Sequence, residues 1–317
     1  MTENRPDGIQ PVSLQNIGPE SVSLCGVSSS FHSLWRLSEA SPPPHHDNLI
    51  VVTEEGHLGR VQGVLNALGA ESAARQTTLL IGPVPRDEVN VCLVNVAGQY
   101  VERLDVHPGP VFLPEMLESL VHPAMTNHVW WACEHAPGNE TLRAVARLAD
   151  QIILDTLTDA PTLVACTLSD LSWERGTPWR TLVARTLDAP EHRSVLPGLQ
   201  CAVVRYAAGD ARPARLFAAW LMNRLKWEDA SRVQLFAVHS ERGTGDLDGL
   251  EISGHGFFGL WDGGTTDVRV RLTVGGSCQD RLLPLLPGRL VDGLAALLAG
   301  SGDSTSQLLR LARSVAT

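Results

Sequence analysis

Short apolar runs alternate with helix-like segments between residues 48 and 155. Runs such as NLIVVT and QIILDT are continuously apolar, which is typical of strands buried on both faces. Residues 56–69 instead carry apolar side chains at the three- and four-residue spacing of a helix face. This alternation predicts an α/β fold with a doubly wound, mostly parallel sheet. The other expected strands are TTLLIG, VNVCLVNVAG and NHVWWAC, and the other expected helices are VFLPEMLESL and the segment that Asn139 can cap.

Residues 1–45 are expected to form an arm and one helix ahead of this domain. The first twenty residues are polar and punctuated by Pro and Gly, whereas residues 24–34 carry apolar side chains at helical spacing. The following ASPPPHHDN ends this helix, because successive prolines cannot continue it. We therefore expect the α/β domain to occupy residues 46–195.

A further helix start is expected at the TPW of residues 177–179. Thr177 is a good N-cap, and Pro178 suits the first helical position because its missing N–H costs nothing there. Arg180 is expected to lie exposed on this helix. The apolar face that follows consists of Trp179, Leu182, Val183 and Leu187.

A second pattern begins near Pro197 and predicts a smaller α+β domain over residues 196–317. It opens with the strand LQCAVVRYA and the helix RPARLFAAWLMNRLKW, which Lys226 closes as a cation that complements the helix dipole. Three strands joined by glycine-rich turns are expected in RVQLFAVHS, LEISGHGFF and TDVRVRLTV, followed by apolar GLAALLAG and a terminal helix in SQLLRLARSVA. A strand, a helix and then a run of strands favour a largely antiparallel sheet.

The composition is that of an acidic globular protein. The 25 Lys and Arg residues against 35 Asp and Glu give a formal charge of −10, whereas a domain that neutralises phosphates would lean the other way. No apolar run approaches the roughly 20 residues of a membrane-spanning helix. No secretory signal is visible at the start. We therefore expect a cytoplasmic protein that contacts neither nucleic acid nor membrane.

The six cysteines are spaced without any CxxC pair, so neither a local zinc ribbon nor a thioredoxin-type pair is expected. Most lie in apolar stretches such as VNVCLVNV and GLQCAVVRY, and we expect small buried hydrophobic residues in a reducing compartment. A redox pair assembled by folding stays an alternative. The positions are Cys25, Cys92, Cys133, Cys166, Cys201 and Cys278.

Few motifs that carry chemistry stand in a suitable context. Gly254, Gly256 and Gly259 have the spacing of a dinucleotide loop, but another strand follows where a helix is required. We therefore expect a turn between strands at these glycines. The sequence also lacks GxxxxGK[ST], GxSxG and HExxH.

Acidic residues follow several expected strands, at the edge where open α/β sheets bind ligands. Such an edge repels phosphate, whereas carboxylates together with waters can hold Mg²⁺. Solvated loop acids are the favoured interpretation, and a magnesium site stays the alternative. The residues are Glu54, Glu55, Glu134 and Asp155.

Tryptophans gather between residues 130 and 179. Trp130 and Trp131 point to opposite faces of an expected buried strand, while Trp173 and Trp179 flank a charged turn that contains Arg175. Core packing is one interpretation. Trp beside Arg is also the composition of protein-interface hot spots.

The segment SDLSWERGTPWRTLV resembles the OpcA family of glucose-6-phosphate dehydrogenase assembly or activator proteins. It matches the family pattern of Asp-Leu-x-Trp followed by Thr-Pro-Trp-Arg, with Ser172 where the family commonly has Asn. NLIVVT, the VERL of residues 101–104, QIILDT and AAWLMNRLKW are similar to further family landmarks, so the resemblance spans roughly residues 12–240. The matching residues are Asp170, Leu171, Trp173, Thr177, Pro178, Trp179 and Arg180.

The resemblance implies a non-catalytic subunit that binds glucose-6-phosphate dehydrogenase and promotes its active oligomer in the oxidative pentose phosphate pathway. No catalytic residue, cofactor or metal is expected with this function. The alternative hypothesis is a small-ligand sensor or a magnesium-dependent enzyme that uses the acidic strand ends. The candidate interface residues are Asp170, Trp173, Arg175, Thr177, Pro178, Trp179, Arg180, Trp130 and Trp131.

Overall fold

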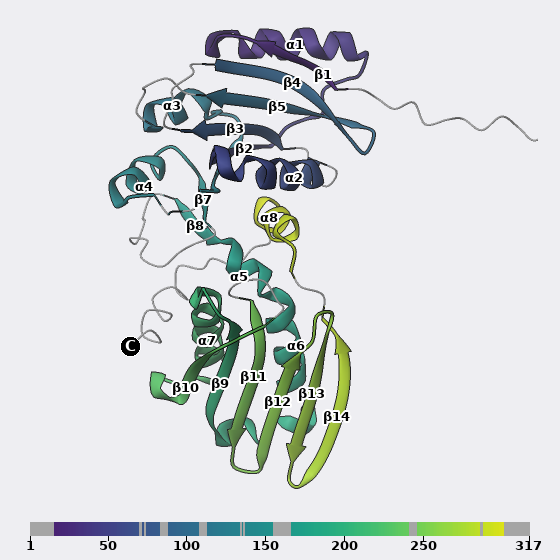
Figure 1. Cartoon of the computed structure of the whole chain (residues 1–317), viewed down its shortest axis with the longest axis vertical. Helices are drawn as coiled ribbons and strands as arrows, with labels where there is room; N and C mark the ends of the chain where they lie inside the picture. The colour runs from purple at the N-terminus through teal and green to yellow at the C-terminus, as the bar shows by residue number, and fades with distance from the viewer. Residues whose placement is uncertain are drawn as a thin grey trace, which may run out of the picture. The chain divides into compact units, whose positions relative to one another are not determined.

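The chain divides into two compact units, Met1–Asn127 and His128–Thr317. Figure 1 labels most of their helices and strands. The domain boundaries expected from the sequence, at residues 46 and 196, differ from this division. They stay a prediction. The computed structural model describes residues 16–69, 72, 74–82, 88–107, 113–133, 135, 137–154, 166–240, 246–285 and 288–300.

The first unit carries the strand order β1-β4-β5-β3-β2. β2 (Asp47–Glu54), β3 (Arg75–Ile81) and β5 (Gln99–His107) pair in parallel, as the alternation of strands and helices predicts. β4 (Glu88–Val96) forms an antiparallel hairpin with β5, and β1 (Ile17–Ser21) pairs antiparallel with β4.

Helices α1 (Val27–Ser38) and α2 (Leu58–Gly69) pack on opposite faces of these strands. On one face, the Trp35 indole of α1 donates to the Glu102 carboxylate of β5 over 2.7 Å. On the other face, Arg103 donates to Asn66 of α2 and to Gln76 of β3, each over 2.9 Å. Neighbouring residues of one strand thus contact different helical layers, which confirms the doubly wound prediction. A further helix, α3 (Leu113–Leu120), follows β5.

Short parallel strands stand at the start of the second unit. β6 (Thr126–Trp131) pairs with β7 (Gln151–Leu154), and β7 pairs with β8 (Thr167–Asp170). Their apolar residues are buried, as continuous apolar runs predict. Helix α4 (Asn139–Val145) connects β6 to β7.

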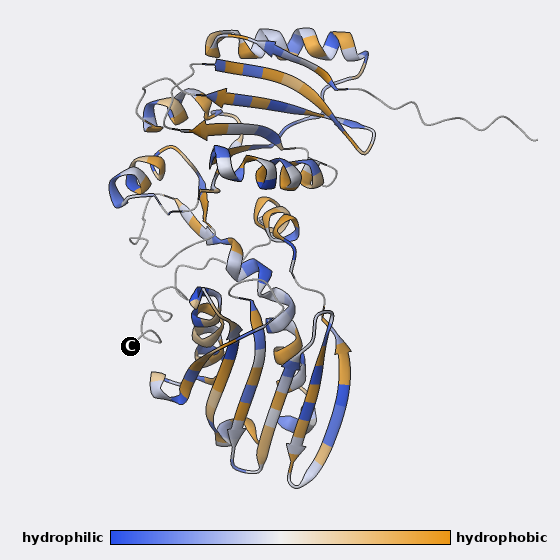
Figure 2. Ribbon diagram, in the orientation of Figure 1, coloured by the Kyte–Doolittle hydropathy of each residue, from blue (hydrophilic) through white to orange (hydrophobic). Residues whose placement is uncertain are grey.

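A second sheet follows, with strand order β10-β9-β11-β12-β13-β14. β9 and β10 pair in parallel and the other neighbouring pairs are antiparallel, which confirms the prediction of a largely antiparallel sheet. Helices α6 (Thr177–Leu187) and α7 (Arg212–Leu225) pack their apolar faces on one side of the sheet. Figure 2 shows hydrophobic and hydrophilic residues alternating along β11 and β13. The strands are Leu199–Ala207 (β9), Val233–Val238 (β10), Leu247–Gly254 (β11), Phe257–Gly263 (β12), Asp267–Val274 (β13) and Ser277–Pro284 (β14).

Helix ends differ from the predicted ones at two places. Helix α6 begins at Thr177 itself with Gly176 as its N-cap, and α4 begins at Asn139 after Gly138. The predictions of Thr177 and Asn139 as capping side chains are therefore wrong. Lys226 does follow the last residue of α7, in the left-handed region with a φ of 55°.

The glycine spacing near residue 256 is confirmed as a turn between strands. Gly256 connects the antiparallel pair β11 and β12 with a φ of +69°, a conformation that suits glycine. Helix α8 (Leu290–Leu298) corresponds to the apolar GLAALLAG segment. The expected terminal helix in SQLLRLARSVA lies outside the described residues. No described helix has the length and apolar character needed to cross a membrane.

Candidate functional site

The Asp-Leu-x-Trp sequence forms a short helix with its own cap. Asp170 ends β8, and its carboxylate accepts hydrogen bonds from the backbone N–H of Ser172 and of Trp173, over 2.7 and 3.1 Å. The Ser172 hydroxyl donates to the same oxygen. Helix α5 (Leu171–Arg175) therefore begins at a buried carboxylate that occupies its N-cap position.

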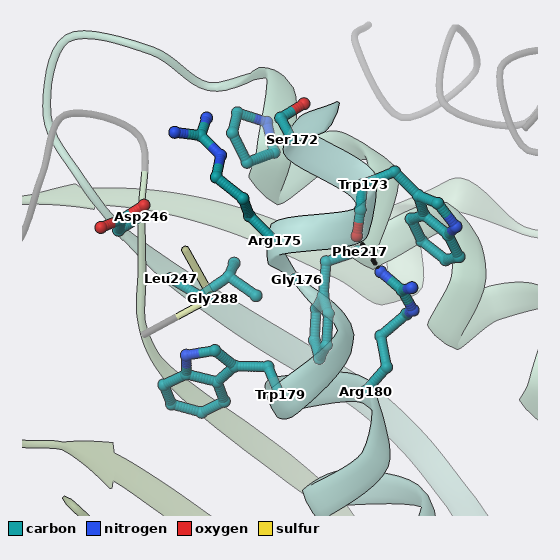
Figure 3. Close-up of a pocket in the computed structure, with 11 residues that line it drawn as sticks. Ser172, Trp173, Arg175, Gly176, Trp179, Arg180, Phe217, Asp246, Leu247 and Gly288 are labelled. Atoms are coloured by element: carbon teal, nitrogen blue, oxygen red, sulfur yellow. Dashed lines mark hydrogen bonds between the residues drawn. The ribbon is translucent and has the colours of Figure 1, made fainter. Parts of the chain in front are cut away.

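Arg180 joins α6 to α5 through three contacts. Its guanidinium donates to the Trp173 carbonyl oxygen, as the dashed line in Figure 3 shows. It also donates to the Thr177 hydroxyl over 2.7 Å, and its Cζ lies 3.3 Å from the centre of the Trp173 ring. Arg180 is 8% exposed, so the prediction of an exposed arginine is wrong. Cation–π stacking and the two hydrogen bonds stabilise its charge at this buried position.

Two glycines allow helix α8 and the segment before it to approach α5 closely. A Cβ on Gly288 would collide with the Arg175 carbonyl oxygen, and one on Gly293 would lie 3.1 Å from the Glu174 Cβ. Beside this contact lies a cleft of about 40 Å³, lined by Arg175, Asp246 and other residues drawn in Figure 3. A volume of this size holds water rather than an organic ligand.

A larger groove of about 700 Å³ lies between α6 and α8. Each helix contributes residues at helical spacing to one wall, and the lining is mostly apolar with charges of both signs. Arg289 and Asp292 of this lining pair with each other, with Arg289 Nε 3.0 Å from Asp292 Oδ2. The groove residues are Glu174, Thr177, Pro178, Thr181, Leu182, Arg185, Pro284, Leu285, Gly288, Arg289, Asp292, Gly293 and Ala296.

The nine candidate interface residues separate into a buried set and a more exposed set. Thr177 is exposed, and it lines the groove together with the half-buried Pro178. Arg175 is half-buried and lines the small cleft. The other six are buried within the protein, so in this conformation they support surfaces rather than form them. They are Asp170, Trp173, Trp179, Arg180, Trp130 and Trp131. Their role at an interface stays a prediction.

The turn between β2 and α2 is where a doubly wound fold holds the phosphates of a dinucleotide. Gly56 and Gly59 stand here at the spacing of the second and third fingerprint glycines, whereas Glu54 occupies the place of the first. Glu55 adds a second carboxylate. These carboxylates would repel a pyrophosphate, so the turn does not fit a dinucleotide.

The acidic strand ends do not assemble a metal site within the described residues, where no group of three His, Cys, Asp or Glu side chains has suitable spacing. Of the four acids that prompted the magnesium alternative, Glu54 and Glu55 lie on the β2–α2 turn. Glu134 and Asp155 lie outside the described residues.

The six cysteines are less buried than predicted. Cys25, Cys201 and Cys278 are exposed, Cys92 and Cys166 are intermediate, and Cys133 is buried. The prediction that most are buried is therefore wrong. Burial raises the pKa of the Cys92 thiol and of the Cys166 thiol to about 11.

Comparison with known proteins identifies relatives of part of the chain. Residues 166–279 match a family named for OpcA and described as the C-terminal domain of a glucose-6-phosphate dehydrogenase subunit. A protein of Nostoc punctiforme named OxPP cycle protein OpcA is 28% identical over 127 residues, and one of the same name from Synechocystis is 26% identical over 131. Each match covers 37% of this chain but only 27% of the relative's own length.

The fold is similar to that of a solved oxidoreductase. KijD10, a 3-ketoreductase from Actinomadura kijaniata whose crystal structure contains NADP and TDP-benzene, aligns with a TM-score of 0.50. The alignment covers 86% of this chain and 96% of KijD10 at 14% identity. At this identity the similarity concerns the fold alone.

Proposed function

Because residues 166–279 match the OpcA family, we propose that the chain is a member of it, and that it binds glucose-6-phosphate dehydrogenase and promotes the active oligomer of that enzyme without catalysing a reaction itself. The observation that carries the proposal is the family match over residues 166–279. That range contains the whole Asp170–Arg180 cluster, which builds α5 and the first turns of α6. The acidic β2–α2 turn agrees with a chain that does not bind the dehydrogenase's own dinucleotide.

We propose that the groove between α6 and α8 is the surface of this chain that binds the dehydrogenase. The buried cluster fixes its position, because Arg180 ties α6 to α5 and the glycines of the α8 segment pack on α5. A groove with residues at helical spacing on each wall and a mostly apolar lining suits the apolar face of a partner helix. Charges of both signs at the groove, from Glu174 and Arg185, would orient that helix.

Activation is tested by titrating the chain into dilute glucose-6-phosphate dehydrogenase, with light scattering measured in parallel. A partner shifts an equilibrium only through its different affinity for the two states, and a coupling of about 1–3 kcal/mol corresponds to about 5–150-fold. We expect activity to rise to a plateau, most strongly where the enzyme alone dissociates. We expect the chain alone neither to oxidise glucose 6-phosphate nor to bind NADP. A flat curve without a complex would contradict the proposal.

The position of the surface is tested separately by blocking the groove. Thr181→Arg places a long side chain at an exposed position in the middle of the α6 wall. We expect it to weaken binding about tenfold or more, because a groove that excludes its partner loses the contacts at its centre. Asn223→Arg, at an exposed position of α7 outside the groove, is the matched control. Equal binding by both variants would remove the groove from the interface.

A further inference from the structure

The first unit contains a cavity that the proposed function does not use. It measures about 200 Å³ and lies beside the first turns of α2, over the parallel strands β3 and β5. Five polar and three apolar side chains line it. They are Gln62, Thr78, Asn90, Asp105 and His107 together with Pro19, Leu58 and Leu80.

The register of the strands explains why polar side chains gather there. Asp105 of β5 is the direct partner of Thr78 on β3 and of Asn90 on β4. The three side chains therefore stand in one row on one face. α2 covers the preceding row, where Arg103 and Gln76 hydrogen-bond to each other. The chain passes from β3 to β5 through the in-sheet strand β4 rather than through a crossover helix that would cover the row of Asp105.

Two groups in the cavity lack a hydrogen-bond partner among the described residues. They are the hydroxyl of Thr78, a residue only 2% exposed, and Oδ1 of Asp105. Leaving such groups unpaired is costly in a folded protein, and a ligand seated in the cavity would pair both. Burial raises the pKa of Asp105, against the opposing effects of a weak hydrogen bond from the Thr78 hydroxyl, which lies outside full hydrogen-bond geometry, and of the charges on Arg103 and His107.

We propose that this cavity binds a small neutral polyhydroxyl compound with the size and chemistry of a monosaccharide. The hydroxyl of Thr78 and the amides of Gln62 and Asn90 both donate and accept hydrogen bonds, as sugar hydroxyls do. An anion would meet the Asp105 carboxyl, and a cation would meet the charge of nearby Arg103. The volume lies below the 300–1,000 Å³ typical of drug-sized ligands, which suits a single ring. This assignment is independent of the dehydrogenase proposal.

The test is titration of the whole chain with D-glucose, D-ribose and myo-inositol, followed by calorimetry and by saturation-transfer NMR. Glucose 6-phosphate serves as the anionic comparison. We expect at least one neutral polyol to bind, and glucose 6-phosphate to bind more weakly than glucose. Absence of binding by all three polyols, or tighter binding of the phosphate ester, would overturn the proposal.

Thr78→Val is the decisive variant, because it replaces a buried, unpaired hydroxyl with a methyl group of similar shape. We expect folding to be preserved and affinity for the bound polyol to fall about fivefold or more. Thr77→Val is the matched control: Thr77 is the next residue of β3, is 1% exposed, also has an unpaired hydroxyl and faces the opposite side of the sheet. Asp105→Asn, which keeps the side-chain shape, should also weaken binding. Wild-type affinity in both cavity variants, or an equal loss in Thr77→Val, would overturn the assignment.

Discussion

Arg180 shows how a residue that looks like surface in the sequence can belong to the core. It follows Trp179 in a helix whose apolar face is evident, yet its guanidinium stacks on Trp173 and donates to the buried Trp173 carbonyl and to the Thr177 hydroxyl. In any variant that lacks the guanidinium, the carbonyl of Trp173 would lose its charged donor and keep only the backbone N–H of Gly176, 3.0 Å away. The loss matters because a hydrogen bond from a charged donor contributes more to stability than one between neutral groups.

We expect Arg180→Ala to lower the free energy of unfolding by about 2–4 kcal/mol, from the lost stacking on Trp173 and the lost charged hydrogen bonds. Arg185→Ala is the control, since Arg185 is exposed on the same helix and should change stability by less than about 0.5 kcal/mol. Urea denaturation followed by far-UV circular dichroism measures both. Similar midpoints for the two variants would show that the buried contacts contribute nothing.

Thiol reactivity is a second property set residue by residue. At neutral pH we expect maleimide to modify the exposed Cys25, Cys201 and Cys278 first, as intact-protein mass would show. Cys92 and Cys166 should react far more slowly, because burial raises the pKa of each thiol to about 11 and leaves little thiolate. Dithiothreitol should leave the melting temperature unchanged. Rapid modification of buried Cys133, or a melting shift on reduction, would contradict this picture.

At the scale of single elements, β5 connects two helical layers through alternate residues. Glu102 accepts from Trp35 of α1, and its Oε2 lies 3.6 Å from His45 Nε2. Burial alone would raise the pKa of Glu102, but the bonds from His45 and Trp35 and the charge of Arg75 outweigh it and leave the pKa below 4.5. The ionised form is therefore the one that holds α1 on the sheet.

We expect Glu102→Gln to cost about 1.5–3 kcal/mol of stability at neutral pH, as for hydrogen bonds to a charged group. Because the folded pKa is lowered, this contribution is complete above pH 4.5 and is lost as pH falls through the folded value. The stability difference between wild type and variant should therefore shrink in acid. Glu88→Gln, at an exposed position of β4, is the control and should show no such convergence. A difference that stays constant with pH would exclude the ionised carboxylate as its source.

Sequence patterns predicted the elements whose burial follows simple periodicity and missed those that break it. Continuous apolar runs identified β2 and β7, because strands covered on both faces need no polar positions. β5 contains VERLDV, whose buried Glu102 and Arg103 look like surface residues until their partners from other elements are known. β14 has no apolar periodicity because most of its residues are exposed. Helix α5 has five residues, which are too few to show a helical periodicity.

The cysteine and cap predictions failed for related reasons. Cys201 lies in an apolar stretch, but it occupies the side of β9 opposite to buried Ala202, which faces the α6–α7 layer. Thr177 was a reasonable cap by residue type, yet α5 ends directly before α6, and the Thr177 hydroxyl accepts from Arg180 instead. In both places tertiary contacts decided the outcome.

For the whole molecule, the division into units can be tested by unfolding. Trp179 and Val183 pack in the core of the second sheet, so helix α6 should unfold together with that sheet. We expect Glu102→Gln to shift an unfolding transition of residues 1–127, and Arg180→Ala to shift a different one. Hydrogen exchange with peptide resolution separates them. If the domain boundary instead lies at residue 196, Glu102 and Arg180 belong to the same domain, and both variants should destabilise the same unfolding transition.

Lys226, at the exposed left-handed end of α7, is the single lysine in 317 residues. Amine-to-amine cross-linking followed by mass spectrometry would therefore find one side chain to couple and would reveal almost nothing of a complex. Reagents that couple carboxylates would have 35 residues to use. The same scarcity makes Lys226 a natural attachment point: an amine-reactive fluorophore would mark the end of one helix and report rotational slowing when a large partner binds.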